Sequence, residues 1–204
     1  MYEILTVCTG NICRSPLAEQ LLRTRLAAFS PRVTSAGTRG LPAAEMTAEA
    51  QRLATERGVS EPDAAAHRSR FLTEKHLDSP DLILAMTREH RRDIAELAPS
   101  RLRSTFTVRE FARLYEATSP EQIRAAADAA GPDASARVRA MAATVAGQRG
   151  LALPPEDPAD DDVIDPFRRS WKTYELSADQ LVPAIDAVVA AINLALAPNS
   201  VVAR

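Results

Sequence analysis

Short strand-like runs that alternate with helical patterns constrain the fold of this chain more than any other feature. Residues 3–7 and 81–86 are apolar, β-rich and as short as buried strands. A run at 33–36 and a weaker one at 105–108 predict two more strands. Helical patterns lie between them, at residues 15–26, 45–57 and 88–97. This alternation predicts βαβ units, and so an α/β fold: a three-layer sandwich with a four-stranded parallel sheet.

Residues 115–162 differ in character from the rest of the chain. Two Ala- and Arg-rich helices are expected at 122–130 and 135–147, with few large apolar side chains. We expect them to bury little and to form a peripheral helical insertion. An acidic, proline-rich stretch at 154–162 is expected to be a solvated connector. The apolar helix expected at 181–196 is predicted to pack on the sheet.

Composition excludes several classes of protein. The 204 residues are 46% hydrophobic and 25% charged with a net charge of -2, typical of one globular domain over residues 1–204. This charge gives no general attraction to nucleic acid. No apolar run is expected to reach the roughly 20 residues that span a bilayer, and no basic segment precedes the first apolar run. We therefore expect a cytoplasmic protein without membrane insertion. Cys/His spacing typical of zinc is lacking, so no metal and no cofactor are expected.

The loop after the first expected strand carries the candidate chemistry. Residues 8–14 read CTGNICR, a cysteine and an arginine separated by five residues, and Ser15-Pro16 is a good helix start. In a parallel sheet this loop lies at the carboxyl edge, where ligands bind. A loop that curls into a helix N-terminus turns its backbone N–H groups inward, and Gly10 supplies conformational freedom. The same field stabilises the thiolate of Cys8, and Arg14 can hold two oxygens of a tetrahedral oxyanion. We therefore predict a phosphate site with a thiolate placed for in-line attack.

Residues 8–16, CTGNICRSP, resemble the signature of the low-molecular-weight protein tyrosine phosphatases. Three further segments resemble landmarks of that family in the expected order: Ser35-Ala-Gly-Thr38, Asp81-Leu-Ile-Leu-Ala-Met86 and Asp165-Pro-Phe167. The resemblance covers residues 2–114 and 163–196, and the segment between them is longer here than is usual in the family.

The resemblance implies hydrolysis of phosphotyrosine in proteins through a cysteinyl-phosphate intermediate, with inorganic phosphate as product. It makes Cys8 the nucleophile and Arg14 the phosphate clamp. Asp165 would protonate the leaving phenolate and then deprotonate the attacking water. Pro166 restricts Asp165 to extended conformations, which stiffens the loop that presents it.

The resemblance also assigns the residues around the nucleophile. The phosphate would be cradled by the backbone N–H groups of Thr9, Gly10, Asn11, Ile12, Cys13 and Arg14. Ser15 would donate a hydrogen bond to the Cys8 thiolate, and Asn11 and His67 would brace the loop with it. His76 and His90 are expected to be surface residues. Cys13 has two interpretations: it fills space, or it closes a reversible disulfide with Cys8 that protects the thiolate.

The substrate end departs from the family pattern. Leu41 occupies the apparent position of an aromatic wall, and Phe167 is followed by two arginines instead of a second aromatic residue. Stacking on a substrate ring would then rely on Phe167. Arg168 and Arg169 either favour acidic flanking sequences or form a solvated basic turn.

Three alternative functions fit parts of the sequence. An arsenate reductase of the same fold would need an external thiol, because no cysteine follows Cys13. A protein-arginine phosphatase is expected to carry threonine where this chain has Ile12. A non-catalytic oxyanion-binding module is expected to have lost Cys8 or Asp165, and both are present.

Overall fold

The computed structural model describes residues 1–40 and 42–197. Four parallel strands form one sheet in the order β2-β1-β3-β4. Their bounds are β1 (Glu3–Cys8), β2 (Arg32–Gly37), β3 (Leu82–Ala85) and β4 (Thr105–Thr107). The central strands β1 and β3 are buried on both faces, which is why both read as continuous apolar runs. The predicted α/β fold with a four-stranded parallel sheet is confirmed.

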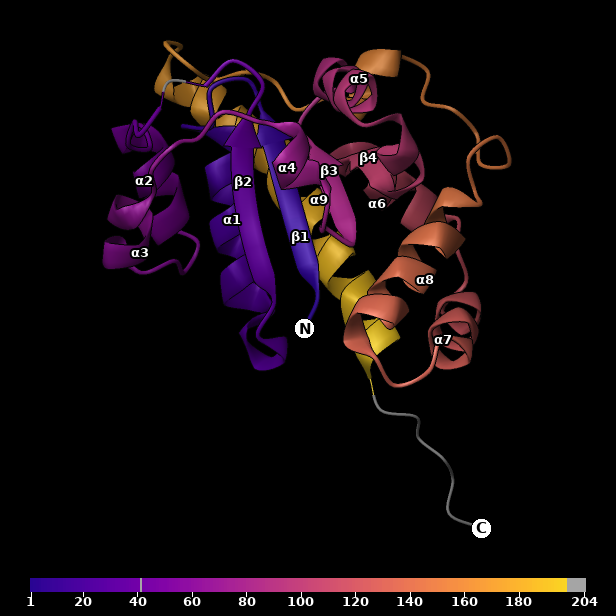
Figure 1. Cartoon of the computed structure of the whole chain (residues 1–204). Coiled ribbons are helices and arrows are strands. Elements are labelled where there is room, and N and C mark those ends of the chain that lie inside the picture. The colour runs from indigo at the N-terminus through magenta and orange to yellow at the C-terminus, as the bar shows by residue number, and fades with distance from the viewer. Residues whose placement is uncertain (41, 198–204) are drawn as a thin grey trace.

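Helices cover both faces of this sheet, as Figure 1 shows. On one face, α1 (Arg14–Arg25) and α9 (Trp171–Leu196) pack in the larger hydrophobic core. On the other face, α4 (Glu74–Leu77) and α5 (Arg88–Leu97) contribute Leu77 and Ile94 to a smaller core. Alternate residues of β1 point to opposite layers, so Ile4 joins the larger core and Leu5 the smaller one.

Three helices follow β4 in the chain and pack beside α9: α6 (Val108–Glu116), α7 (Pro120–Ala129) and α8 (Ala134–Ala146). The expectation that the Ala-rich helices bury little is wrong. Ile123, Val138 and Met141 are fully buried in the larger core. The many alanines let α7 and α8 approach α9 closely, so a few larger side chains per helix suffice to fill the space between them.

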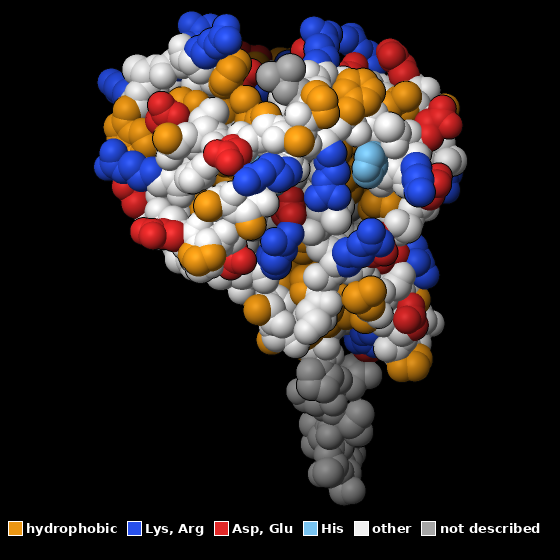
Figure 2. Space-filling view, turned by 60° about the vertical axis from the view of Figure 1, so that its left-hand side comes forward, with side chains coloured by type: hydrophobic (Ala, Val, Ile, Leu, Met, Phe, Trp, Pro, Cys, Tyr) orange, Lys and Arg blue, Asp and Glu red, His pale blue; other side chains and the backbone are white. Residues whose placement is uncertain are grey.

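The remaining elements are short. In the chain, two more helices precede α4 between β2 and β3, namely α2 (Ala48–Thr55) and α3 (Glu61–Ala66). Three 3-10 turns complete the described chain: η1 (Ala27–Phe29), η2 (Pro99–Ser104) and η3 (Pro158–Asp161). Basic and acidic side chains are interspersed over the face seen in Figure 2. That face offers no broad single-sign surface, in keeping with the small net charge.

Helix α9 differs from its prediction in length. It has 26 residues rather than 16, and it continues through Pro183. By length and composition alone, it is the one helix among the described residues that is long and apolar enough to cross a membrane. The expectation that no segment reaches that length is therefore wrong. Its buried residues, including Leu181, Ile185 and Val188, lie in the larger core.

Candidate active site

Cys8 ends β1 and begins the loop that leads into α1. Its Sγ lies 3.0 Å from Ser15 Oγ and accepts a hydrogen bond from the Asn11 backbone N–H at 3.2 Å. Cys8 is buried, and α1 begins six residues after it, at Arg14. Hydrogen-bonding groups thus surround the sulfur at the N-terminus of a helix, where a bound anion is also stabilised.

Asn11 takes the strained conformation of the loop. Its φ is +54°, whereas Gly10, expected to supply the conformational freedom, has no positive φ. Asparagine tolerates the left-handed region when its side chain bonds locally. Here the Asn11 amide donates to Ser15 Oγ at 2.9 Å and to Ser35 Oγ at 2.8 Å, and its Oδ1 accepts from the Arg70 N–H at 2.9 Å. The buried Asn11 side chain thus ties the loop to β2 and to the segment before α4.

His67, the residue that follows α3, contacts the loop. Its Nε2 is 2.8 Å from the Asn11 carbonyl oxygen, and burial lowers the pKa of the imidazole. Glu19 on α1, which the sequence analysis did not single out, is buried behind it. The Glu19 carboxylate accepts from Ser35 Oγ and lies 3.9 Å from His67 Nδ1.

Gly37 at the end of β2 lets the loop approach the sheet. A Cβ at this position would lie 2.6 Å from Thr9 O, closer than real Cβ atoms approach other atoms, and 3.0 Å from Asn11 N, a tight contact. The next N–H groups then bond to the loop, Thr38 N to Cys8 O and Arg39 N to Thr9 O, both at 2.9 Å. Gly37 is therefore required by the close packing of two backbones.

Arg14 is buried and points its guanidinium at the same space as the Cys8 thiol. Its Nη1 donates to Val163 O at 3.0 Å. Its Nη2 lies 3.1 Å from Asp165 Oδ2 and 3.4 Å from Thr9 Oγ1. The Nε is also buried, and it has no hydrogen-bond partner among the described residues. One donor of a buried cation is thus left for an acceptor that the described part of the chain does not supply.

Asp165 belongs to a loop that ion pairs fix in place. Asp162 accepts from the Arg88 backbone at 2.7 Å and pairs with its guanidinium, and Val163 N donates to Met86 O at 2.8 Å. Asp161 pairs with Arg113 at 2.7 Å. The acidic stretch expected to be a solvated connector therefore anchors the loop to α5, α6 and the end of β3. Asp165 itself is half exposed at the mouth of the site.

A cavity of about 180 Å³ joins these groups. Its lining contains most residues that the sequence analysis singled out: Cys8, Thr9, Gly10, Ile12, Cys13, Arg14, Asp165 and Phe167, with Arg39 in addition. Phe167 is 41% exposed, and the guanidinium of Arg168 lies 5.1 Å from its ring centroid. Leu41, the other residue expected in the substrate slot, lies outside the described residues.

The model of the low molecular weight phosphotyrosine protein phosphatase family matches residues 3–122. The chain belongs to this family. The matched range includes the loop, Ser35, His67 and Thr87, whereas Asp165 lies beyond it. The resemblance drawn from the 8–16 segment is confirmed.

Some relatives of this chain are named tyrosine phosphatases and others arginine phosphatases. The chain is 41% identical to the low molecular weight protein-tyrosine-phosphatase Etp of Escherichia coli over 97 residues, which are 48% of this chain and 62% of Etp. It is 39% identical to a protein-arginine-phosphatase of Geobacillus stearothermophilus over 110 residues, 54% of this chain and 71% of that protein. A solved YwlE arginine phosphatase from the same organism superposes with a TM-score of 0.64 at 28% identity, covering 93% of this chain and 92% of that one.

Cys13 and His90 also contact residues of this site or of the elements around it. Cys13 Sγ lies 3.5 Å from Thr47 Oγ1 and 3.7 Å from the Tyr174 hydroxyl, and burial raises the pKa of its thiol to about 11. Both cysteines are free.

His90, expected at the surface, is instead 3% exposed, and its Nε2 lies 2.8 Å from Thr9 Oγ1. The Thr87-Arg-Glu-His90 pattern indicates the start of α5 in the sequence, but not the contact of His90 with Thr9.

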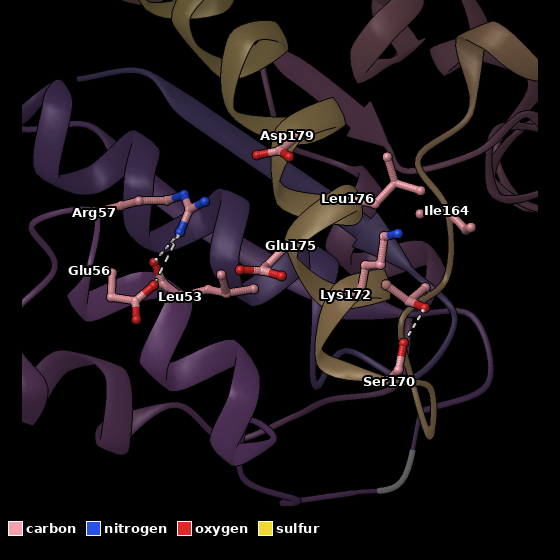
Figure 3. A pocket seen from close by; sticks show the side chains of 10 residues that line it. Leu53, Glu56, Arg57, Ile164, Ser170, Lys172, Glu175, Leu176 and Asp179 are labelled. Atoms are coloured by element: carbon pink, nitrogen blue, oxygen red, sulfur yellow. Dashed lines mark hydrogen bonds and ion pairs between the residues drawn. The ribbon is translucent and has the colours of Figure 1, made fainter.

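A larger cavity of about 690 Å³ lies elsewhere, between α2 and the first turns of α9 (Figure 3). Basic and acidic side chains alternate around it, among them Arg57, Lys172, Glu175 and Asp179. Its lining contains neither cysteine nor histidine, so we do not assign the family chemistry to it. The described residues include no group of His, Cys, Asp and Glu that could hold a metal ion.

Proposed function

We propose that this chain is a cysteine-dependent phosphomonoesterase that hydrolyses phosphotyrosine in proteins. The observation that carries the proposal is the buried Nε of Arg14, which lacks a partner among the described residues while its guanidinium lines the cavity of Cys8. A tetrahedral phosphoryl group above the thiol supplies acceptors for this donor and for the N–H groups of the loop. The match to the relatives spans only part of their length, about three fifths of Etp, so the activity is inferred from the site.

In the first step the Cys8 thiolate attacks phosphorus in line with the leaving oxygen. An S–P bond forms while the bond from phosphorus to the tyrosine oxygen breaks. Asp165, at the mouth of the cavity, gives its proton to the departing phenolate. Arg14 binds two of the three remaining oxygens, and Asn11 and Ser15 hold the sulfur by the contacts described above.

In the second step a water molecule attacks the phosphorus of the cysteinyl-phosphate. Asp165, now a carboxylate, takes a proton from this water, and the S–P bond breaks. Inorganic phosphate leaves, and the thiolate of Cys8 is restored. Apart from the substrate and one water molecule, every group that the two steps use belongs to the chain, so we propose that no cofactor takes part.

Phosphotyrosine is the preferred substrate because the cavity walls are apolar above the loop. Phe167 and Ile12 both line it and offer surfaces for an aromatic ring. Phosphoarginine is the second candidate, because a relative 39% identical to this chain is named a protein-arginine-phosphatase. We also propose a cytoplasmic location, since the mechanism needs Cys8 as a free thiol.

The first experiment measures hydrolysis of an aryl phosphate in excess chelator by freshly reduced protein and by Cys8→Ser. We expect turnover by the wild type and none by the variant. An inactive wild type contradicts the proposal, and thiol-dependent reduction of arsenate is then assayed with the same two proteins.

A second experiment separates the two substrate classes. Matched peptides that carry phosphotyrosine or phosphoarginine are compared for kcat/KM with the wild type and Ile12→Thr. We expect the wild type to prefer phosphotyrosine and Ile12→Thr to shift the ratio toward phosphoarginine. A wild type that prefers phosphoarginine assigns the chain to the second candidate function.

A further inference from the structure

His90 links the first turn of α5 to the cysteine loop. Its backbone N–H donates to Thr87 Oγ1 at 3.3 Å, and its Nδ1 lies 2.8 Å from the same oxygen. The other ring nitrogen, Nε2, lies 2.8 Å from Thr9 Oγ1. Thr9 Oγ1 in turn lies 3.4 Å from Arg14 Nη2. A continuous chain of polar contacts therefore runs from the start of α5 to the guanidinium.

A similar cap with the same Thr-x-x-His spacing occurs a second time in the chain, without the link. Thr73 and His76 at the start of α4 repeat the spacing of Thr87 and His90, and Thr73 Oγ1 lies 2.9 Å from His76 Nδ1. Among the described residues, His76 forms hydrogen bonds only within this cap. Capping alone therefore does not account for the contact between His90 and Thr9.

We propose that His90 is a positioning residue, which fixes the Thr9 hydroxyl and through it the Arg14 guanidinium in the orientation that binds a phosphoryl group. The inference rests on the proposed function, because it concerns the affinity of the same site for phosphate. His90 itself does not line the cavity, whereas Thr9 and Arg14 do.

The protonation of His90 fits this role. Burial, followed by the nearby charge of Arg14, lowers the pKa of His90 to about 3, with Arg39 lowering it further and Asp162 opposing. The imidazole is therefore neutral at neutral pH and carries one N–H. Among the described residues, His90 Nδ1 is the one acceptor in contact with the Thr87 hydroxyl, so we assign the hydroxyl proton to this contact. His90 Nε2–H then donates to Thr9.

This assignment sets the direction of the Thr9 hydroxyl. Thr9 Oγ1 accepts from His90 Nε2–H and from Arg14 Nη2–H, so its own proton is free to point into the cavity. Without His90 the hydroxyl is free to rotate, and Arg14 Nη2 loses a fixed acceptor. Arg14 then has fewer restraints, and the phosphoryl group loses a preorganised donor.

The test compares His90→Ala with His76→Ala as the matched control. The dissociation constant of inorganic phosphate is measured by calorimetry, and KM, kcat and phosphate inhibition are measured with an aryl phosphate. We expect His90→Ala to weaken phosphate binding and raise KM by about fivefold to tenfold, the effect of one hydrogen bond. His76→Ala should change neither value by more than about twofold, since exposed capping contacts are local.

Thr9→Val provides the second arm. It removes the hydroxyl but not the cap of α5, and we expect it to weaken phosphate binding as much as His90→Ala does. In the double variant the two losses should not add, because both break the same chain of contacts. If His90→Ala fails to fold, Thr9→Val still tests the link, and His90→Gln, which keeps an N–H donor, should restore part of the affinity.

Two results overturn the inference: unchanged phosphate affinity in folded His90→Ala and in Thr9→Val, or losses that add in the double variant. Calorimetry reports binding without turnover. An inactive wild type that binds phosphate with the expected dependence on His90 contradicts the proposed function alone.

Discussion

Arg14 Nη2 and Asp165 Oδ2 lie 3.1 Å apart across the mouth of the cavity. The guanidinium thus holds the residue proposed as the acid at the place where a phosphoryl oxygen would bind. A substrate phosphate must therefore displace the carboxylate from Arg14 as it enters. The two anions compete for one cation, and the displaced carboxyl is left beside the leaving oxygen.

This competition predicts opposite effects of Asp165→Asn on chemistry and on binding. We expect kcat for an aryl phosphate to fall by about 10²- to 10⁴-fold, the usual contribution of a general acid. Inorganic phosphate should bind at least as tightly as to the wild type, because the rival carboxylate is gone. Steady-state kinetics with phosphate as inhibitor measures both. An unchanged kcat would show that another group supplies the proton.

Gly37→Ala should damage the site through the backbone. Its Cβ would lie 2.6 Å from Thr9 O, so the loop must move away from β2. We expect kcat/KM to fall by at least about tenfold, and the free energy of unfolding by about 1–3 kcal/mol, as for other overpacked positions. Gly58→Ala is the control. It strains a residue at φ +89° with open space around it, so it should lower stability and leave kcat/KM unchanged.

His90 should make the stability of the protein depend on pH. Its pKa is lowered from 6.5 to about 3 in the folded state, so the unfolded chain binds the proton more readily. The contribution of neutral His90 is fully present above pH 6.5 and is lost as pH falls toward 3. Urea unfolding of the wild type and His90→Gln between pH 7 and pH 4 measures this. The wild type should lose stability more steeply, and parallel curves would contradict the assigned burial.

The two cysteines should react at very different rates. Burial raises the pKa of Cys13 to about 11, so this thiol stays protonated at neutral pH. Cys8 lines the cavity and is held by Asn11 and Ser15. Limited alkylation at pH 7, followed by peptide mapping, should label Cys8 first, and inorganic phosphate should slow the labelling. Preferential labelling of Cys13 would contradict the arrangement.

Whether Cys8 and Cys13 form a reversible disulfide remains a prediction. The structure has both as free thiols, and Cys13 contacts Thr47 and Tyr174. Peroxide treatment followed by mapping under non-reducing conditions should yield a Cys8–Cys13 link that dithiothreitol reverses. A Cys13→Ala variant should then lose activity irreversibly under the same treatment.

The sheet and the cysteine loop could be predicted from the sequence because local signals agree there. The apolar runs of β1 and β3 are each complete within a few residues, and the cysteine-to-arginine spacing and the Ser15-Pro16 helix start follow β1 directly. The burial of α7 and α8 could not be predicted in this way. It depends on how closely their alanines approach α9, which no local pattern records.

The contacts that complete the site were missed for a similar reason. Glu19, Gly37 and His90 each act through a partner far away in the sequence: Ser35, the Thr9 backbone and the Thr9 hydroxyl. A lone histidine in a polar helix gives no sign of the loop it will meet. Likewise, the conformational freedom of the loop was expected from Gly10, and the residue with positive φ was not foreseen. The structure has it at Asn11 because the amide side chain finds three partners there.

The central claim is a covalent phosphoryl group on Cys8, and it is tested most directly by trapping that intermediate. Wild-type protein is mixed with an aryl phosphate, quenched in acid within the first turnover, and analysed by intact mass and peptide mapping, with Cys8→Ser and Cys13→Ala in parallel. We predict one phosphoryl group on the peptide that contains Cys8, both in the wild type and in Cys13→Ala. We predict no phosphoryl-cysteine in Cys8→Ser. Turnover of the substrate by wild-type protein that never carries phosphate on Cys8 would contradict the account.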